Sequence, residues 1–366
     1  MPNTKLTIKV PGKLMIAGEF AVLEPYQKLA VMAVDRFVFT TIQNSEQNYL
    51  SLMNFQMDKL NWRYDSIREN VFIDTDDKRV DFVANAMSIA LTYLKECGIS
   101  PSNFSLTINS ELDEAGVKYG LGSSAAVVTS AIAAILNKYM PENVSEELIF
   151  KLAAITHATT QGNGSGADVA ASSYGGVLAY SSFQAEWLNR EFRNRVSLKN
   201  LIGREWKYLS VQPLLIPEQV HICVGWTGKP ASTKKLVNEL LKLKVVNAIE
   251  YELFLKRSEE AVNLFLNGMK ETDTSLIIEG IRRNRRALAK VGKEADVEIE
   301  TPLLTKLCDI AEYYNGAGKP SGAGGGDCGI AIMPSEESAD RVKKAWQKAG
   351  IKVLELNVPS KGAISI

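Results

Sequence analysis

The chain has 366 residues, of which 46% are hydrophobic and 23% are charged, a composition typical of a globular protein long enough for two domains. Its 42 Lys and Arg residues balance its 42 Asp and Glu residues, so the formal net charge is zero. This balance argues against nucleic acids and membrane surfaces as partners, because both attract proteins with a basic excess.

Hydrophobic periodicity predicts the elements of the first half of the chain. In chain order we expect a strand at 6–10 broken by Pro11-Gly12, a strand or hairpin at 14–23, a strand at 30–42, a helix at 80–96, a strand at 104–108, a loop at 120–124, helices at 125–139 and 148–160, a glycine-rich loop at 162–166, a strand at 176–180 and a polar, basic stretch at 184–207.

Pro213 and Pro217 mark a candidate domain boundary, which divides the chain into residues 1–212 and 213–366. In the second part we expect a strand at 220–224, helices at 230–243, 252–266, 275–290 and 303–314, a glycine-rich loop at 316–326, a strand at 329–333, a helix at 336–349 and a strand at 353–358. Strands and helices do not alternate strictly, which favours two α+β domains over a doubly wound parallel sheet.

A loop of glycines and serines precedes the helix expected at 125–139. It reads Gly120-Leu121-Gly122-Ser123-Ser124. Glycines let backbone amides approach a polyanion, and the start of a helix adds unpaired N–H groups and the positive end of its dipole. The pattern therefore predicts a phosphate site, although a serine could also serve as an ordinary helix cap. The loop matches neither a Walker A motif nor a dinucleotide fingerprint.

Three segments, at 10–20, 120–126 and 319–328, resemble in order the three motifs of the GHMP kinases. The resemblance implies the two-domain α+β GHMP kinase fold, with the active site in the interdomain cleft. The ATP loop at 118–126 would belong to the first domain and the third glycine motif at 319–328 to the second. ATP and Mg²⁺ are the implied cofactors.

The resemblance also implies roles for individual residues. Lys13 and Asp168 match the catalytic pair, although they could instead be a surface lysine and a helix cap. The implied ATP-binding residues are Lys118, Gly120, Leu121, Gly122, Ser123, Ser124 and Ala125, with Ser123 and Ser124 also as Mg²⁺ ligands. The implied substrate-binding residues are Glu19, Ser165, Lys229, Ser232, Thr233, Gly324 and Gly325. Further candidates for ligand contact are Tyr26 and Asn284-Arg285.

Within this superfamily the chain most resembles the phosphomevalonate kinases, through the segments at 162–171, 225–233 and 319–328. A phosphorylated small-molecule substrate would need positive charge opposite it, which the Lys-rich segment at 229–235 could supply. The alternatives are a mevalonate kinase, another GHMP small-molecule kinase, or an ATP-binding sensor without catalytic activity. We expect a monomer or a homodimer.

The chain contains only two histidines, His157 and His221, which excludes a histidine-rich metal site. His157 stands where mevalonate kinases carry a Mg²⁺-binding glutamate. Imidazole is a poor ligand for Mg²⁺, so we expect His157 to be a packed helix residue. The basic run at 282–293 is expected to be a solvated helix face.

The four cysteines form no Cys-x-x-Cys pair, which predicts free thiols in a reducing compartment. No apolar run reaches the roughly 18 residues of a membrane span, and the first residues lack the apolar region of a signal peptide. We therefore expect a cytoplasmic protein.

Overall fold

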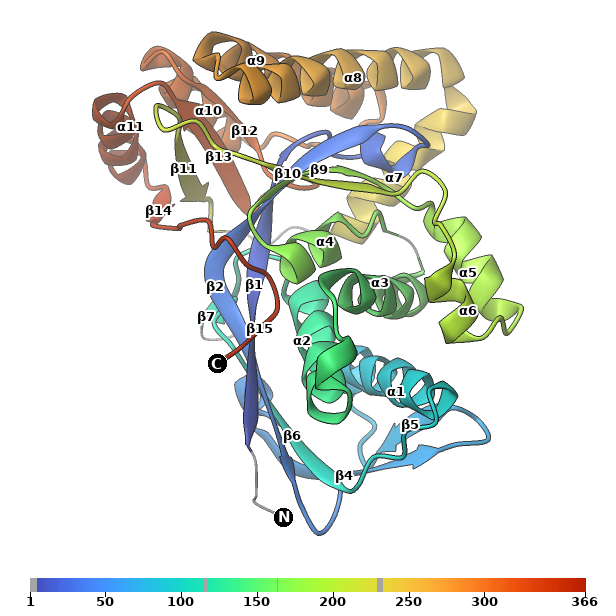
Figure 1. Cartoon of the computed structure of the whole chain (residues 1–366). Coiled ribbons are helices and arrows are strands. Elements are labelled where there is room, and N and C mark those ends of the chain that lie inside the picture. Colours follow the sequence, from blue (N-terminus) through green and yellow to red (C-terminus); the bar gives the residue numbers. More distant parts are fainter. Residues whose placement is uncertain (1–4, 115–116, 163, 229–232) are drawn as a thin grey trace.

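The structure, a computed structural model, describes residues 5–114, 117–162, 164–228 and 233–366 (Figure 1). Its strands are β1 (Leu6–Ala17), β2 (Lys28–Asn44), β3 (Tyr49–Leu52), β4 (Met57–Asp65), β5 (Asn70–Ile73), β6 (Phe104–Ser110), β7 (Asp113–Glu114), β8 (Val117–Lys118), β9 (Val177–Ser181), β10 (Ser210–Leu214), β11 (His221–Trp226), β12 (Ala317–Pro320), β13 (Cys328–Met333), β14 (Lys352–Leu354) and β15 (Ile364–Ser365).

The α-helices are α1 (Asp81–Glu96), α2 (Ser123–Tyr139), α3 (Glu146–Gln161), α4 (Ala167–Tyr174), α5 (Ala185–Arg193), α6 (Leu198–Gly203), α7 (Thr233–Val246), α8 (Ala248–Glu271), α9 (Thr274–Glu294), α10 (Pro302–Tyr313) and α11 (Glu336–Lys348). Short 3₁₀ helices lie at η1 (Ala21–Leu23), η2 (Met53–Phe55), η3 (Lys78–Val80) and η4 (Pro141–Asn143).

The larger sheet is organised around the long strands β1 and β2. In the described part of the chain it has nine strands, in the order β10-β9-β2-β6-β3-β4-β5, with β1 paired to β2 and β15 paired to β1. The opposite edge of β2 is shared by β9, which pairs with residues 28–32, and by β6, which pairs with residues 38–44. The fold is thus the mixed α/β arrangement expected from the sequence.

Strand β1 does not stop at Pro11-Gly12, so the break expected there is wrong. The register against β2 shifts between Pro11 and Gly12 instead, and the strand continues to Ala17. Proline lacks the N–H that a regular ladder needs, and an irregularity of this kind tolerates the loss. As a result the residue after Gly12, Lys13, lies inside a strand and is held by its ladder.

Helices α1 to α4 cover one side of the larger sheet (Figure 1). Residues 125–136 of α2 are almost all buried, and its small Ala side chains allow β1, β2, α1 and α3 to pack around it. A helix that is apolar on all sides belongs inside a protein. The apolar core continues through α8, α9 and β13, so segments from both halves of the chain share it.

The smaller sheet has the order β12-β13-β11-β14 among the described residues, and all of its pairs are antiparallel. Helices α10 and α11 pack against it through a separate apolar cluster that includes Leu307, Val342 and Trp346. Helices α8 and α9 form a long antiparallel pair at the end of the molecule (Figure 1).

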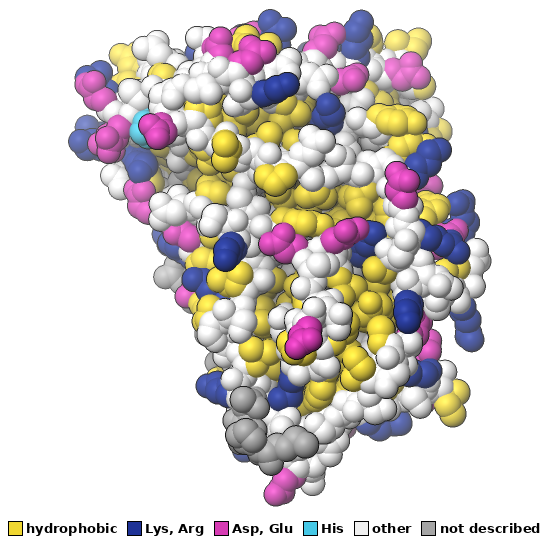
Figure 2. Space-filling view, viewed as in Figure 1, with side chains coloured by type: hydrophobic (Ala, Val, Ile, Leu, Met, Phe, Trp, Pro, Cys, Tyr) yellow, Lys and Arg dark blue, Asp and Glu magenta, His cyan; other side chains and the backbone are white. Residues whose placement is uncertain are grey.

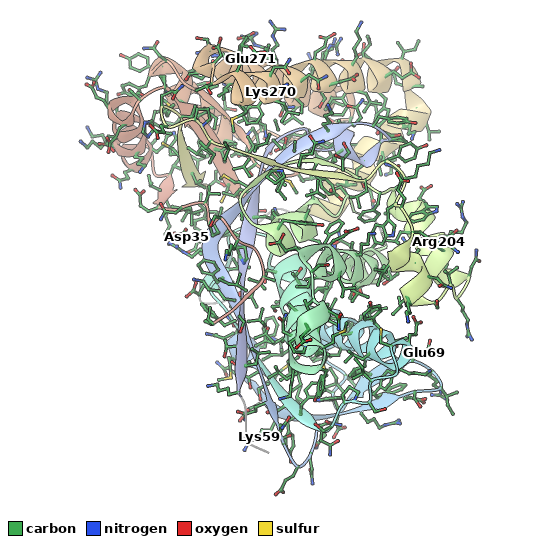
Figure 3. All side chains as sticks on the ribbon, viewed as in Figure 1. Asp35, Lys59, Glu69, Arg204, Lys270 and Glu271 are labelled. Atoms are coloured by element: carbon green, nitrogen blue, oxygen red, sulfur yellow. The ribbon has the colours of Figure 1, made fainter. Side chains whose placement is uncertain are left out.

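The last residues of the chain return to the larger sheet. Asn357 donates from its backbone N and from Nδ2 to the two carboxylate oxygens of Asp35 on β2, both at 2.8 Å (Asp35 is labelled in Figure 3). Ser365 and Ile364 then pair with β1. Close by, a Cβ on Gly362 would lie 2.2 Å from the backbone of Ser173, so the returning segment packs tightly against α4.

The expected boundary at residue 212 falls inside β10, and the part 213–366 contributes strands to both sheets. Pro213 lies within β10, which a proline can enter because β10 is an edge strand. The sequence interpretation also missed β3, β4 and β5 and the helices α5 and α6. The start of the helix expected at 230 lies outside the described residues, and the strand expected at 353–358 is only the short β14.

In the described residues, no helix is both long and apolar enough to cross a membrane. On the face shown in Figure 2, acidic and basic side chains are mixed around a central area of hydrophobic side chains. This mixing agrees with the zero formal net charge.

Gly362→Ala tests the packing of the returning segment on α4. We expect the free energy of unfolding to fall by about 1–3 kcal/mol, because the new methyl group would overlap backbone atoms of Ser173 that cannot rotate away. Gly203→Ala is the matched control, since nothing lies within 4 Å of its new Cβ. Urea unfolding of both variants measures the difference, and equal stabilities would contradict the close contact.

Candidate active site

A cavity of about 360 Å³ lies where β1, α2, α3, α4, α7 and the segment after β12 meet. Its polar wall brings together residues that are far apart in the sequence, namely Lys13, Glu19, Ser123, Ser124, His157, Ser165, Asp168, Ser321 and Asp327. The remaining wall is apolar and includes Met15, Phe20, Val22, Leu29 and Val237. The cavity therefore joins charged and hydroxyl groups to an apolar surface.

Strand β1 touches the glycine-serine loop directly. The backbone N of Lys13 donates to Leu121 O at 2.8 Å, and Lys13 Nζ donates to Gly120 O at 3.1 Å. A Cβ on Gly12 would lie 2.7 Å from Leu121 O, so only glycine allows this approach. On the other side of the contact, a Cβ on Gly122 would lie 2.8 Å from Lys13 Cγ. The Lys13 ammonium is thus fixed over the loop.

The first backbone N–H groups of helix α2 have no side-chain cap. Gly122 is the N-cap residue, with a φ of 79°, and no side chain caps the helix. The serine cap considered from the sequence is therefore absent from this helix start. Its unpaired N–H groups and the positive end of the helix dipole face the cavity that Ser123 and Ser124 line. An anion with several oxygen atoms fits this arrangement.

Asp327 brings the third glycine-rich segment to the same loop. A Cβ on Gly120 would lie 2.7 Å from Asp327 Cγ, so the carboxyl group rests directly on the Gly120 backbone. Thr227 donates to the backbone carbonyl of Asp327 through both its N and its Oγ1, at 3.0 Å each. The sequence interpretation did not single out Asp327, although it lies inside the third motif.

Asp168 lies in the first turn of α4, after the N-cap residue Gly166. Its Oδ1 accepts a hydrogen bond from the backbone N of Val169 at 2.9 Å, and its side chain is 22% exposed. Asp168 is therefore not the cap itself. Its other oxygen, Oδ2, lies 3.8 Å from His157 Nε2. An acidic group in this position is favoured by the helix dipole.

His157 is buried on α3, as expected, but it also belongs to the site. Its Nε2 lies 3.2 Å from Ser124 Oγ, in addition to its approach to Asp168. The ring packs near Phe82, with centroids 5.5 Å apart. The sequence predicted a packed helix residue in preference to a metal ligand or a catalytic group, because the contacts to Ser124 and Asp168 come from two other helices.

A buried ion pair connects the first and third motifs. Lys319 is 0% exposed and Glu19 is 4% exposed, and their Nζ and Oε1 atoms are 2.5 Å apart. Lys319 Nζ also donates to Pro320 O at 2.6 Å, and Gly322 N donates to Glu19 Oε1 at 3.3 Å. The sequence suggested Glu19 as a substrate contact, and Glu19 does line the cavity. One of its oxygens, however, is occupied by Lys319.

The other predicted ATP-loop and acceptor residues divide into several groups. Leu121 and Ala125 are buried, so only their backbone atoms could serve a ligand. Ser165 lines the cavity. Lys229 and Ser232 lie outside the described residues, as do the side chains of Lys118 and Thr233.

Gly324 and Gly325 do not line the cavity. A Cβ on Gly324 would lie 2.2 Å from Ile299 O, and Gly325 N donates to that same oxygen at 2.8 Å. These two glycines let the third segment pack against the chain before α10, whereas Ser321 and Gly322 line the cavity. Substitution at Gly324 is therefore expected to affect folding, because any side chain there would overlap the backbone of Ile299.

The weaker candidates for ligand contact also have other roles. Asn284 is fully buried, and Arg285 binds Glu300, Asp309 and Glu312. Tyr26 is 74% exposed and packs edge to face against Tyr208.

The donor atoms at the cavity suit a magnesium ion that is shared with phosphate oxygens. No group of three or more His, Cys, Asp or Glu residues capable of holding a metal occurs among the described residues. Mg²⁺ does not require such a cage, because it often keeps several waters and binds through one or two protein oxygens plus substrate phosphates. The Ser123 and Ser124 hydroxyls and the Asp168 carboxylate can supply those protein oxygens.

Comparison with known proteins identifies the family. Residues 83–176 match the model of the GHMP kinases N terminal domain, and residues 265–352 match the model of the GHMP kinases C terminal domain. The chain is 34% identical over 364 residues to the phosphomevalonate kinase of Streptomyces sp. (strain CL190), and the match covers 96% of each chain.

Two solved structures share the fold over nearly the whole chain. The Lin0012 protein from Listeria innocua superposes with a TM-score of 0.93 at 38% identity, covering 99% of both chains. The Streptococcus pneumoniae phosphomevalonate kinase in complex with phosphomevalonate and AMPPNP superposes with a TM-score of 0.84 at 25% identity, covering 96% of this chain and 99% of that one.

Lys319→Met tests the buried ion pair. It leaves the Glu19 carboxylate buried without its partner, so the free energy of unfolding should fall by about 3–5 kcal/mol. The double variant Lys319→Met/Glu19→Gln removes both charges and should recover part of this loss. Lys242→Met, which breaks an exposed pair with Glu239, should cost less than about 1 kcal/mol. Additive losses in the double variant would contradict the pairing.

Cys328 should resist alkylation. Its Sγ donates to Tyr119 O at 3.2 Å, and burial raises the pKa of its thiol to about 12. Because the raised pKa keeps the thiol neutral below that pH, and only the thiolate attacks, iodoacetamide at pH 8 should leave Cys328 unmodified. Half-buried Cys97 should react first. Mass spectrometry of the peptides measures both rates, and equal labelling would show that the loop contact opens readily.

Proposed function

The chain belongs to the GHMP kinases, and from this premise we propose that it transfers the γ-phosphoryl group of ATP to 5-phosphomevalonate. The products are 5-diphosphomevalonate and ADP, a step of the mevalonate route to isoprenoids. The observation that carries the proposal is the convergence of Lys13, the open start of α2 and Asp168 in one cavity. The similarity to the Streptomyces phosphomevalonate kinase over 96% of the chain supports the choice of acceptor.

The phosphate chain of ATP lies, in this proposal, across the loop from Gly120 to Ser124. The backbone amides at the start of α2 and the serine hydroxyls bind its oxygens. The Lys13 ammonium, held by Gly120 O at 3.1 Å, is placed to stabilise charge on the migrating phosphoryl group. Phosphoryl transfer depends mainly on such positioning and charge neutralisation.

Magnesium, bound through a serine hydroxyl and phosphate oxygens, would neutralise part of the negative charge on the nucleotide. Lys13, Ser123 and Ser124 line the same cavity, so their side chains would bind and orient the phosphate oxygens. The apolar wall that includes Met15, Val22 and Leu29 is suited to the hydrocarbon part of a small acceptor and limits access of water.

Asp168 has little need to act as a general base. The acceptor atom is an oxygen of a phosphate monoester, whose second pKa is about 6, so it is largely ionised at neutral pH. We propose that Asp168 instead holds its neighbours in place, as its contact with His157 at 3.8 Å allows. Lys13 Nζ donates to Gly120 O at 3.1 Å, so the loop backbone also holds the ammonium in place.

The phosphate group of the acceptor is assigned to the Lys-rich segment at 229–235, which precedes and begins α7. Support for this assignment comes from Val237, the residue through which helix α7 reaches the cavity. We further propose that the enzyme works in the cytoplasm as a monomer or homodimer, with neither nucleic acid nor membrane as a partner.

An ADP-release assay with Mg·ATP tests the acceptor directly, with mevalonate and 5-phosphomevalonate offered side by side. We expect turnover with 5-phosphomevalonate alone. Turnover with mevalonate would keep the kinase chemistry and overturn the substrate assignment. Binding of ATP without turnover of either acceptor would instead indicate a nucleotide sensor.

Lys13→Met should lower kcat by about 10²–10³-fold, because it removes the cation beside the phosphoryl group and keeps the stem that packs on Gly122. Lys9→Met is the control on the same strand, because Lys9 packs over the Phe37 ring and does not line the cavity. Steady-state kinetics of both variants check this, and an equal effect on kcat would exclude a role for Lys13 in the site.

Asp168→Asn should leave the pH dependence of kcat unchanged, because the acceptor phosphate needs no base to ionise it. The measurement is a pH–rate profile of the wild type and the variant between about pH 6 and 9. Recovery of the variant's activity at high pH would mean that Asp168 removes a proton, and it would contradict the proposed role.

A further inference from the structure

His157 joins the nucleotide side of the cavity to its acceptor side. It is 4% exposed, and the single atom Nε2 lies 3.2 Å from Ser124 Oγ on α2 and 3.8 Å from Asp168 Oδ2 on α4. All three residues line the cavity. The ring is held by helix α3 and by its contact with Phe82, so its direction is set by packing.

The Asp168 carboxylate decides which way the hydrogen bond to Ser124 runs. A lone pair on Nε2 would face the negative Oδ2, whereas an Nε2–H group is attracted to it. The distance of 3.8 Å is too long for a hydrogen bond but short for an electrostatic interaction. The arrangement therefore favours the proton on Nε2, which then donates to Ser124 Oγ.

A serine hydroxyl has one proton and two lone pairs. When Ser124 Oγ accepts from His157, its own proton must point elsewhere, and the cavity is the open side. There it meets the position assigned to the phosphate chain at the start of α2. Ser124 is thereby turned into a donor toward phosphate.

We propose that His157 is a positioning residue that fixes the Ser124 hydroxyl as a hydrogen-bond donor to the phosphate chain of the nucleotide. The inference rests on the proposed function, since it takes the bound anion to be a nucleoside triphosphate. It also separates two residues that the sequence treated alike. Because the side of Ser124 that faces the cavity then presents its proton and not a lone pair, we assign the magnesium ion to the Ser123 hydroxyl.

The test is the dissociation constant of ADP, measured by calorimetry with EDTA and again with excess Mg²⁺. Without metal, His157→Phe should weaken ADP binding about fivefold, since a correctly oriented hydrogen bond is lost while the ring packing is kept. Ser124→Ala should weaken it about tenfold or more. His157→Phe should have no further effect when Ser124 is already Ala, because both changes remove one interaction.

Conservative variants separate positioning from packing. His157→Gln places an N–H group near the position of Nε2 and should bind ADP within about twofold of the wild type. Ser123→Ala should lose the gain in affinity that Mg²⁺ brings, whereas Ser124→Ala should keep that gain. His221→Gln, at the other histidine, lies on β11 away from the cavity and is the control for histidine loss. If His157→Phe does not fold, His157→Met repeats the test with a flexible side chain that lacks a donor.

Each result has a distinct meaning. An unchanged ADP affinity in His157→Phe, additive effects with Ser124→Ala, or equal losses in His157→Gln and His157→Phe would each overturn the positioning role. A loss of the Mg²⁺ gain in Ser124→Ala rather than in Ser123→Ala would overturn the separation of the two serines. A wild-type protein that binds no ADP would instead overturn the proposed function.

Discussion

The hydrogen bond from Lys13 N to Leu121 O is the contact on which the site depends. It lets β1 lie against the loop before α2, and it exists only because Gly12 has no Cβ. The same contact holds the Lys13 ammonium at Gly120 O, above the open start of α2. A cation and a row of free amides are thereby placed together before any ligand arrives, so binding need not pay to organise them.

The third glycine-rich segment, near the other end of the chain, also contacts the first motif and the glycine-serine loop. Lys319 and Glu19 pair in the interior, and Asp327 rests on Gly120. The residues after β14 add two further contacts. Asn357 donates a hydrogen bond to Asp35, and Gly362 packs on α4, the helix that carries Asp168. The fold thus converts three short motifs, separated by up to 300 residues, into one wall of a cavity.

Local patterns predicted the parts of this site that are encoded locally. The expected glycine-serine loop and the long apolar helix after it are confirmed, since the loop leads directly into α2. They could be predicted because the residues that form them are adjacent in the sequence. The continuation of β1 through Pro11 depends on a register shift against β2, which no local pattern reveals. The Lys319–Glu19 pair and the two contacts of His157 depend on tertiary packing in the same way. The close packing of Gly324 on Ile299 is likewise a tertiary contact, which its place in a glycine-rich motif does not reveal.

A crystal structure of the chain with a non-hydrolysable ATP analogue, Mg²⁺ and 5-phosphomevalonate would test the central claim most directly. We expect the phosphate chain to cross the amides of residues 122–125, with the γ-phosphorus between Lys13 Nζ and the acceptor phosphate. Ser124 Oγ should lie within hydrogen-bond distance of both a phosphate oxygen and His157 Nε2. A phosphate chain bound away from the start of α2, or an acceptor outside this cavity, would contradict it.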